Sequence, residues 1–286
     1  MMRRAEPEDV PALRAFLMDH ADIAMFALSN LDTEGLARDG AENPARSIYA
    51  WIDGEPVTAC IAITAEGMIL PVLPDNDPRH WAAVAPHMAG RRAFGVTGEA
   101  GAARAGFDML GLARQGCALD RDEPHFVLPL EDMVLPDMAG FEVLRPEESH
   151  RALMIRWRMA YHLEILGTNP MSVERIATAD IDRVFRTDSY RLLVRDGEVV
   201  SMAGINAAAG DVVQIGGVFT PPELRGRGLA RRAVAGMLDE KRRNGIRRAV
   251  LFAASDMAAK AYVAIGFRRI GSYTLTLFDP PVRIPA

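Results

Sequence analysis

The chain has 286 residues, of which 49% are hydrophobic and 25% are charged, proportions that are ordinary for a globular protein. At about 100–200 residues per domain, this length predicts two domains. The net charge of -5 argues against general nucleic-acid binding and favours smaller partners.

The two cysteines, Cys60 and Cys117, lack the spacing of metal ligands, so we expect no metal site, no disulfide framework and a reducing compartment. The first ten residues lack the apolar core of a signal sequence. No stretch approaches the roughly 18 apolar residues of a membrane span. We therefore expect a soluble, cytoplasmic monomer or homodimer with no membrane partner.

In the first half, the opening residues R-R-A-E-P-E-D-V predict a short strand followed by a helix start with proline and acids. Residues 50–57, A-W-I-D-G-E-P-V, predict a strand, a D-G turn and a second strand. A strand-like run at 67–73 is followed by P-D-N-D-P, which is acidic and has no paired glycines. That segment is not expected to hold a phosphate.

A break near residues 131–140 divides the chain, and the second half opens like the first. F-E-V-L-R-P-E-E at 141–148 repeats the strand, proline and acid pattern, and L-V-R-D-G-E-V-V at 193–200 repeats the D-G hairpin pattern. We interpret this as two copies of one fold, in domains 1–135 and 140–286.

The second half predicts an α/β (α+β) domain with a mixed sheet. We expect helices at about 148–166 and 171–186, then strands at about 189–195, 198–208 and 211–220. A helix to about 244 leads to a strand at 248–254 that is apolar on both faces, as a buried parallel strand should be. A helix at 256–265 ends at Gly266, and residues 267–278 supply the last strands.

The glycine turn, R-G-R-G-L-A at 225–230, lies between the strand at 211–220 and an amphipathic helix. Unpaired main-chain N–H groups and the helix dipole make such a helix start an anion site. Four arginines crowd it, although each cation there is unfavourable by about 0.3–1 kcal/mol unless an anion binds: Arg225, Arg227, Arg231 and Arg232. The turn thus predicts a pyrophosphate site; the alternative is a solvated basic turn.

Two other phosphate motifs do not fit this turn. No lysine follows the glycines as in a nucleotide triphosphatase, and the G-x-G-x-x-G fingerprint of dinucleotide-binding folds is absent.

These residues resemble the GCN5-related N-acetyltransferase (GNAT) superfamily over most of 141–278. The turn fits the family motif Q/R-x-x-G-x-G/A through Arg225, Gly228 and Ala230, and residues 258–267 fit A-x-x-x-Y-x-x-x-G-F. The layout resembles the tandem two-domain type in which the N-terminal copy is degenerate. This resemblance implies two mostly antiparallel mixed sheets flanked by helices, with a splayed parallel strand pair at the cofactor site.

The resemblance also implies how acetyl-CoA binds, once per chain. The main chain of Val218 and Phe219 would pair with the pantetheine arm, after a bulge at Gly216-Gly217. The glycine turn and the helix start would hold the pyrophosphate through Arg225, Gly226, Arg227, Gly228, Leu229, Ala230 and Arg231. Ser255 stands where the family often has asparagine, so it either contacts the cofactor or caps the helix that follows.

For catalysis, the family uses a tyrosine that matches Tyr262 to protonate the leaving CoA thiolate, and a phenol with a reference pKa near ~10 is suited to this. The alternative is a core tyrosine. No residue declares itself as the base. Candidates for the acceptor site are Tyr161, His162, Glu164 and Gln214, although packing or surface roles also fit them and glutamine cannot act as a base.

We therefore expect an N-acetyltransferase that transfers acetyl from acetyl-CoA to a primary amine of a small molecule by direct attack. The alternatives are a CoA-binding sensor without turnover and an acetyltransferase acting on a protein lysine or N-terminus.

Overall fold

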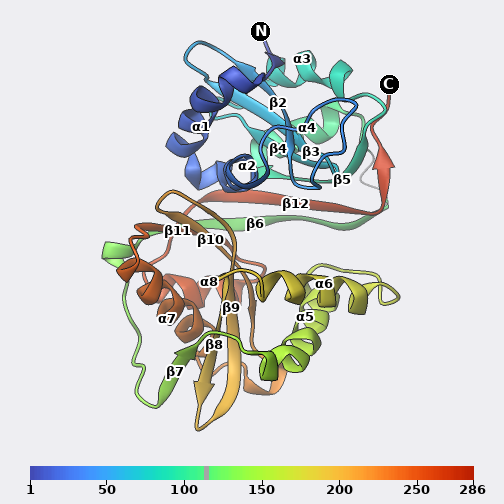
Figure 1. The fold of residues 1–286 in the computed structure, drawn as a ribbon. Coiled ribbons are helices and arrows are strands. Elements are labelled where there is room, and N and C mark those ends of the chain that lie inside the picture. Colours follow the sequence, from blue (N-terminus) through green and yellow to red (C-terminus); the bar gives the residue numbers. More distant parts are fainter. Residues whose placement is uncertain (113–115) are drawn as a thin grey trace. The chain divides into compact units, whose positions relative to one another are not determined.

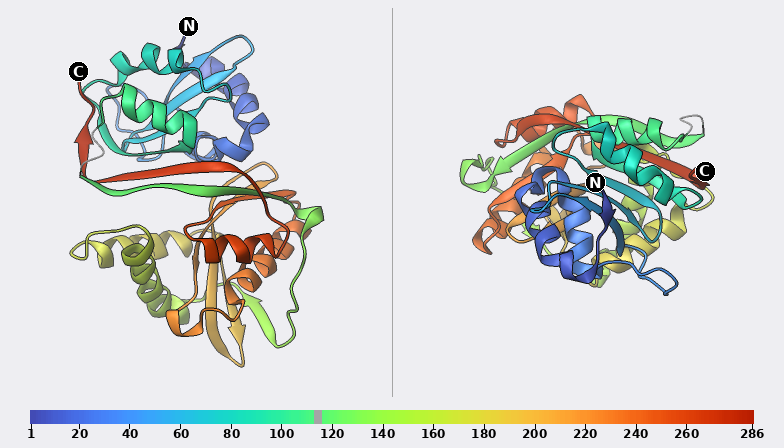
Figure 2. Two further views of the ribbon diagram at one scale, coloured as in Figure 1. Left: turned by 180° about the vertical axis from the view of Figure 1, so that it is seen from behind. Right: turned by 90° about the horizontal axis from the view of Figure 1, so that it is seen from above.

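The computed structural model describes residues 1–112 and 116–286, which form two compact units. Unit 1 comprises Met1–Glu123 and Gly271–Ala286, and unit 2 comprises Pro124–Ile270. Figure 1 labels the helices and strands, and Figure 2 shows the same ribbon from behind and from above.

Unit 1 holds four α-helices among its described residues, α1 (Val10–Asp19), α2 (Ala21–Glu34), α3 (Pro78–Met88) and α4 (Ala100–Met109). A 3-10 turn at Pro7–Asp9 precedes α1. The strands are β1 (Arg3–Arg4), β2 (Ile48–Asp53), β3 (Ala59–Thr64), β4 (Met68–Val72), β5 (Arg92–Glu99) and most of β12 (Arg268–Arg283).

Unit 2 also has four α-helices, α5 (Arg151–Ile165), α6 (Val173–Val184), α7 (Leu229–Arg243) and α8 (Asp256–Val263). Short 3-10 turns lie at Leu130–Asp132, Glu148–His150 and Pro222–Leu224. The strands are β7 (Phe141–Leu144), β8 (Tyr190–Arg195), β9 (Glu198–Ala209), β10 (Val212–Phe219), β11 (Arg248–Phe252) and the end of β6 (Cys117–Pro129).

The two units share one sheet topology, which confirms the fold predicted from the repeated sequence patterns. The strand order is β1-β2-β3-β4-β5-β12 in unit 1 and β7-β8-β9-β10-β11-β6 in unit 2. Among the described pairs, β4 with β5 and β10 with β11 are parallel, and the others are antiparallel. A helix connects each parallel pair, α3 in unit 1 and α7 in unit 2.

The division of the chain differs from the expected domains 1–135 and 140–286. The last strand pairs with β5 of unit 1, from Tyr273↔Glu99 to Arg283↔Arg92, and so its residues from 271 belong there. In turn, β6 completes the unit 2 sheet by pairing with β11, from Arg248↔Pro129 to Phe252↔His125. A strand's sequence pattern shows that it is a strand but not which distant strand it joins, so the exchange was not foreseen.

The core of unit 2 lies on both faces of its sheet (Figures 1 and 2). On one face, α7 and α8 pack against β10 and β11 through residues such as Val213, Ile215 and Leu251. On the other face, α5 and α6 pack against Leu192, Met202 and others. The predicted apolar stripe of the helix after the glycine turn is buried as expected, at Ala233, Val234, Met237 and Leu238.

The two D-G segments form different turns. Arg195 pairs directly with Glu198 across a two-residue turn in which Asp196 and Gly197 both have positive φ, the geometry that Asp-Gly favours. In unit 1 the turn is longer, and Thr58 N donates to Asp53 O at 2.8 Å to close it.

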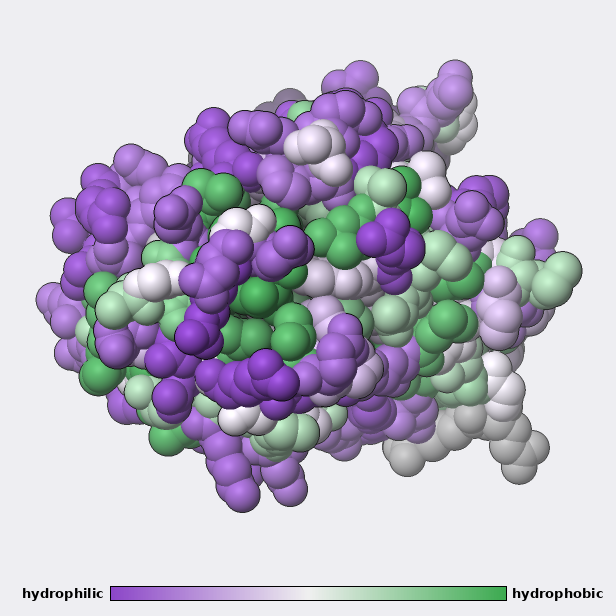
Figure 3. All heavy atoms as spheres, turned by 90° about the horizontal axis from the view of Figure 1, so that it is seen from below, coloured by the Kyte–Doolittle hydropathy of each residue, from purple (hydrophilic) through white to green (hydrophobic). Residues whose placement is uncertain are grey.

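The face of the molecule in Figure 3 is largely hydrophilic, with hydrophobic residues gathered towards its middle. Among the described helices, none combines the length and the apolar character that crossing a membrane requires.

Candidate functional site

The N-terminus of α7 is open. Its N-cap is Gly228, in the left-handed region at φ 70° and ψ 23°, and no side chain in the described part of the chain caps the helix. The Arg232 N–H donates to Gly228 O at 3.4 Å, so by helix geometry the N–H groups before it have no acceptor within the helix. The first turn contains no acidic residue. Donors and dipole together therefore favour an anion here.

Two glycines give the turn its backbone path. Gly226 and Gly228 have φ of 78° and 70°, values that other residues rarely adopt. A Cβ at Gly226 would have nothing within 4 Å, so only conformation requires glycine there. A Cβ at Gly228 would lie 2.9 Å from Arg231 Nε, so a side chain would also press on that guanidinium.

Two of the four arginines hold the turn in place. Arg225 makes a two-pronged ion pair with Glu164 at 2.6 and 2.7 Å and donates to Thr220 O at 3.0 Å. Arg232 donates to Asp137 O at 2.8 Å and to the carbonyls of Arg227 and Gly228 at 3.2 and 3.3 Å. Their side chains are therefore engaged by the protein itself.

The other two arginines fit an anion. Arg231 Nε is buried and has no hydrogen-bond partner among the described residues. Arg227 donates to Glu223 O at 3.2 Å. A buried N–H without an acceptor costs free energy that a phosphate oxygen would recover. The residues present at the α7 N-terminus therefore fit the predicted pyrophosphate.

The strand leading to the turn has a free edge. β10 pairs with β11 from Val212↔Arg248 only as far as Ile215↔Leu251, but continues to Phe219. Its pairing with β9 also shifts register between Gly216 and Phe219, which confirms the predicted bulge. Val218 and Phe219 thus lie where β10 has left β11, and an extended ligand could pair with their main chain.

Tyr262 lies on α8, with 7% of its surface exposed, in the hydrophobic cluster that also contains Leu229 at the start of α7. Its ring meets Phe267 edge-on at 6.0 Å between centroids. The Tyr262 side chain is thus shielded from water, as a proton donor to a thiolate requires. The same burial also fits the alternative, a tyrosine that only packs in the core. Its catalytic role stays a prediction.

Ser255 is the N-cap of α8, and its side chain accepts a hydrogen bond from the Ala258 N–H at 3.2 Å. Of the two roles expected for Ser255, the helix cap is therefore confirmed. Contact with the cofactor stays a prediction.

His162 is buried in a polar network of α5 and α6. Its Nε2 lies 2.9 Å from Asp180 Oδ2 and its Nδ1 lies 3.1 Å from Thr168 Oγ1. The same Asp180 oxygen accepts from Arg158 Nε at 2.7 Å. Burial opposes ionisation of Asp180, but the hydrogen bonds from His162 and Arg158 outweigh it and hold the pKa of Asp180 well below its usual range.

The other acceptor-site candidates occupy different places. Glu164 pairs with Arg225, which lowers the pKa of Glu164, so it joins the end of α5 to the glycine turn. Tyr161 is half-buried, with the Arg158 guanidinium 4.8 Å above its ring. Gln214 is buried on β10 at 2% exposure. These side chains come from α5 and β10 and do not form one hydrogen-bonded cluster.

Three residues that sequence reasoning missed surround the bulge. They are Tyr190, Arg158 and Asp180. The first two lie close to Gly217, which has φ 60°: a Cβ on Gly217 would lie 1.8 Å from Tyr190 Oη and 3.2 Å from Arg158 Nη1. Asp180 holds Arg158 in place. Only the Gly-Gly pair hinted at this close approach, since the other residues come from α5, α6 and β8.

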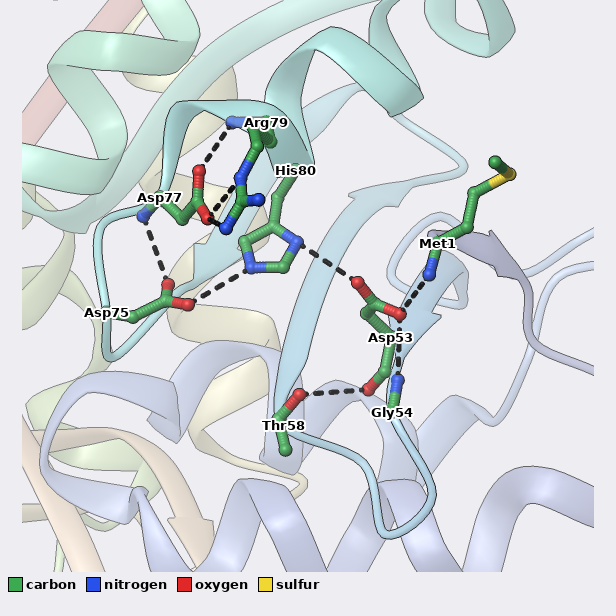
Figure 4. Close-up of polar contacts among 8 residues, drawn as sticks. All are labelled: Met1, Asp53, Gly54, Thr58, Asp75, Asp77, Arg79 and His80. Atoms are coloured by element: carbon green, nitrogen blue, oxygen red, sulfur yellow. Dashed lines mark hydrogen bonds and ion pairs between the residues drawn. The ribbon is translucent and has the colours of Figure 1, made fainter.

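Unit 1 has the corresponding helix start, but it is already occupied (Figure 4). Asp77 caps α3, accepting from the Arg79 N–H at 2.9 Å and from Arg79 Nε at 2.7 Å. These hydrogen bonds hold the pKa of Asp77 at about 2, so the carboxylate is charged at neutral pH. It fills the place that an anion takes at a helix N-terminus.

The neighbouring polar groups also hold one another. Oxygen and nitrogen atoms of Asp75, Asp77 and His80 lie within 4.8 Å, a spacing that metal ligands share. However, His80 Nε2 lies 3.3 Å from Asp75 and its Nδ1 lies 3.6 Å from Asp53, as Figure 4 shows. Asp75 also accepts from the Asp77 N–H at 3.1 Å. The cluster thus fastens the loop before α3.

Comparison with known proteins agrees with this geometry. Residues 152–267 match the model of the acetyltransferase (GNAT) family, and this range includes the open helix start, the β10 edge and Tyr262. Residues 152–267 form a GNAT domain. Among curated proteins, none matches the chain.

Solved structures share the fold over nearly the whole length. A Drosophila protein aligns with a TM-score of 0.63 at 14% identity, covering 96% of this chain and 98% of its own. A tandem GNAT protein from the clavulanic acid biosynthesis pathway aligns with a TM-score of 0.54 at 12% identity, covering 100% of this chain and 99% of its own. A GCN5-related N-acetyltransferase from Sphaerobacter thermophilus aligns with a TM-score of 0.52 at 17% identity, covering 100% of this chain and 96% of its own. The chain therefore has the tandem GNAT fold.

Proposed function

We propose that this protein is an N-acetyltransferase that transfers the acetyl group of acetyl-CoA to a primary amine of a small molecule. A GNAT domain implies acyltransferase chemistry, and the open N-terminus of α7, with the buried and unpartnered Arg231 Nε, carries the proposal for the donor. In unit 1, Asp77 closes the equivalent helix start, so we propose one acetyl-CoA per chain.

Each part of the carrier would meet a different feature of unit 2. The N–H groups of the first turn of α7, with Arg227 and Arg231, would hold the pyrophosphate. The main chain of Val218 and Phe219 would pair with the pantetheine amides. The sulfur end would then lie between the diverging strands β10 and β11.

The chemistry follows from this placement. The amine nitrogen attacks the thioester carbonyl carbon, so that a C–N bond forms and the C–S bond breaks. The Tyr262 hydroxyl would donate its proton to the departing sulfur. The proton that the amine loses would pass to water, and the Tyr262 oxygen would take a proton back from water before the next turnover. Holding the two reactants together supplies much of the rate enhancement, because a bimolecular step becomes effectively unimolecular.

The test has two parts. Calorimetric titration with acetyl-CoA should give one site per chain, and a thiol-release assay over a panel of primary amines should show amine-dependent turnover. Binding without turnover on any small amine or peptide would favour a sensor, and turnover on peptides alone would favour a protein acetyltransferase. Failure of acetyl-CoA to bind would refute the proposal. Propionyl-CoA in the same assay measures the acyl preference.

A further inference from the structure

Two arginines of unit 1 stack on the same pair of aromatic rings. Tyr49 and Trp51 lie two residues apart on β2, so their side chains project from one face of the sheet. The Arg4 guanidinium carbon lies 4.6 Å from the centroid of the Tyr49 ring and 5.2 Å from that of Trp51. The corresponding distances for Arg91 are 4.4 and 5.7 Å. Two positive charges are therefore gathered over one small area.

The two cations come from separate parts of the fold. Arg4 belongs to β1 and pairs directly with Trp51, and its Nη2 donates to Ala37 O at 3.0 Å. Arg91 lies between α3 and β5, and its Nε donates to His87 O at 3.2 Å. Each guanidinium is thus held by one main-chain carbonyl. Their other N–H groups donate no hydrogen bond to the described residues.

No carboxylate in the described part of the chain accepts a hydrogen bond from either guanidinium. One acid approaches the pair: Asp39 lies 3.5 Å from Arg91 Nη2, and its side chain is 74% exposed. By contrast, Asp32 accepts from Nε and Nη2 of Arg14, at 2.8 and 3.0 Å. Burial lowers the pKa of Arg4, and the charge of Arg91 lowers it further, against the opposing effect of Asp39. The two neighbouring charges are therefore only weakly compensated.

The chemistry of the pair favours a phosphate dianion. Each guanidinium presents a planar fork of N–H donors that matches phosphate oxygens, and such charge-assisted hydrogen bonds are roughly twice as strong as neutral ones. A dianion balances two cations, and its oxygens can accept from both forks. A carboxylate carries a single charge and is matched by one fork, as Asp32 is by Arg14. The site is open to such a ligand, because 29% of the Arg91 side chain is exposed.

We propose that Arg4 and Arg91 form a phosphate-binding site on unit 1, over the rings of Tyr49 and Trp51. The ligand is inorganic phosphate or a phosphate monoester, since both present several oxygens of a dianionic group. Asp39 competes with this ligand, and its exposed side chain can turn away when the ligand binds. The inference does not depend on the acetyl-CoA site, which lies in unit 2.

The Trp51 indole, beneath the two guanidinium groups, provides the readout. The chain has three tryptophans, so the labelled protein gives three indole N–H signals in an NMR spectrum, and Trp51→Phe identifies the signal of Trp51. Inorganic phosphate is titrated at about pH 8, where most of it is dianionic, with sodium chloride added to keep the ionic strength constant. Acetate is titrated in the same way as the carboxylate reference.

The titrations compare the wild type with three variants of the site, Arg4→Gln, Arg91→Gln and Asp39→Asn. The matched control is Arg14→Gln, which removes an arginine of the same unit that already has a carboxylate partner.

We expect phosphate to shift the Trp51 signal with a Kd of roughly 1 mM, and acetate to bind at least about tenfold more weakly. Arg4→Gln and Arg91→Gln should each weaken phosphate binding about tenfold, as the loss of a charge-assisted hydrogen bond suggests, and Arg14→Gln should not. Asp39→Asn should strengthen it about two- to fivefold, the range of an exposed ion pair.

Three results would overturn the inference. They are a Trp51 signal that does not respond to phosphate, an equal response to acetate, and unchanged phosphate binding in both Arg4→Gln and Arg91→Gln. The comparison of phosphate with acetate in the wild type decides even if a variant misfolds. None of these results bears on the proposed acetyl-CoA site.

Discussion

The helices α3 and α7 occupy the same place in two copies of one sheet, yet their N-caps differ, a carboxylate in α3 and a glycine in α7. Each connects the parallel pair of its unit, β4 with β5 and β10 with β11. The start of α3 is capped by the carboxylate of Asp77, and the start of α7 has two left-handed glycines and no side-chain cap. One helix supplies its own anion, and the other leaves the place open for a ligand.

The last helices of the two units, α4 and α8, also differ at one matching position. Tyr262 is the seventh residue after the N-cap Ser255 of α8. Counted from the N-cap Glu99 of α4, the seventh residue is Gly106, against which the Trp81 ring packs so closely that an added Cβ would lie 2.2 Å from it. Unit 1 thus fills with an indole the place that unit 2 gives to a phenol.

This comparison shows that the fold and the site are separable. Strand order and crossover are retained in both units, whereas the groups suited to a carrier are found in unit 2. Function resides in a few residues placed on a fold and not in the fold itself. The comparison can be tested at each of these residues.

The largest effect is expected from Gly228→Glu, which gives α7 the carboxylate that α3 already has. We expect acetyl-CoA binding to be lost in calorimetry, because the new charge takes the anion position and the left-handed backbone disfavours a side chain. Gly40→Glu is the matched control, since Gly40 has φ 72° in an exposed segment with nothing within 4 Å of an added Cβ. Normal affinity in Gly228→Glu would show that α7 is not the anion site.

Next, Tyr262→Phe removes the phenol that distinguishes α8 from α4. We expect kcat to fall by about 10²–10⁴, the usual contribution of a general acid, with the Kd for acetyl-CoA unchanged. Steady-state kinetics with the best amine of the panel provide the measurement. If turnover is unchanged although chemistry is rate-limiting, Tyr262 is only a core residue.

Asp180→Asn tests a contrast in burial between the arginine partners of two acids, Arg158 with Asp180 in unit 2 and Arg79 with Asp77 in unit 1. Asp180 and Arg158 have only 18% and 13% of their side chains exposed, whereas Arg79, the partner of Asp77, is 89% exposed. Leaving Arg158 buried without its carboxylate should lower the free energy of unfolding by about 3–5 kcal/mol in urea titrations. A loss below 1 kcal/mol would mean that the pair is effectively solvated.

The same variant predicts a pH dependence. The folded pKa of Asp180 lies below its unfolded value of about 3.9, so its stabilisation is fully present above that pH and is lost as the pH falls towards the folded pKa. The difference in stability between wild type and Asp180→Asn should therefore be constant from about pH 5 to 8 and shrink below about pH 4.

The smallest effect is expected from Asp77→Asn. Asparagine caps helices about as well as aspartate, so the melting temperature should change little. The number of acetyl-CoA sites should remain one, because the segment before α3 has no glycine turn and no arginine equivalent to Arg231. If calorimetry found two acetyl-CoA sites in this variant, the Asp77 carboxylate alone would be what prevents acetyl-CoA from binding at the N-terminus of α3.

Local sequence patterns were enough to determine much of this protein. The glycine turn, the apolar stripe of α7 and the D-G hairpin depend on residues close together in the chain, and all three lie where they were predicted. The repeated patterns in the two halves likewise predicted one fold twice. Backbone conformation and periodicity are short-range properties, so the sequence alone reveals them.

Only the tertiary structure decided which residues meet. It placed most of β12 in unit 1 and the end of β6 in unit 2, because strand pairing is a long-range choice among similar strands. It showed that Arg225 and Arg232 hold the turn, whereas Arg231 keeps a buried Nε without a partner among the described residues. It also brought Arg158, Asp180 and Tyr190 together from three elements. Ion pairs and buried hydrogen bonds depend on spatial proximity, which no local pattern encodes.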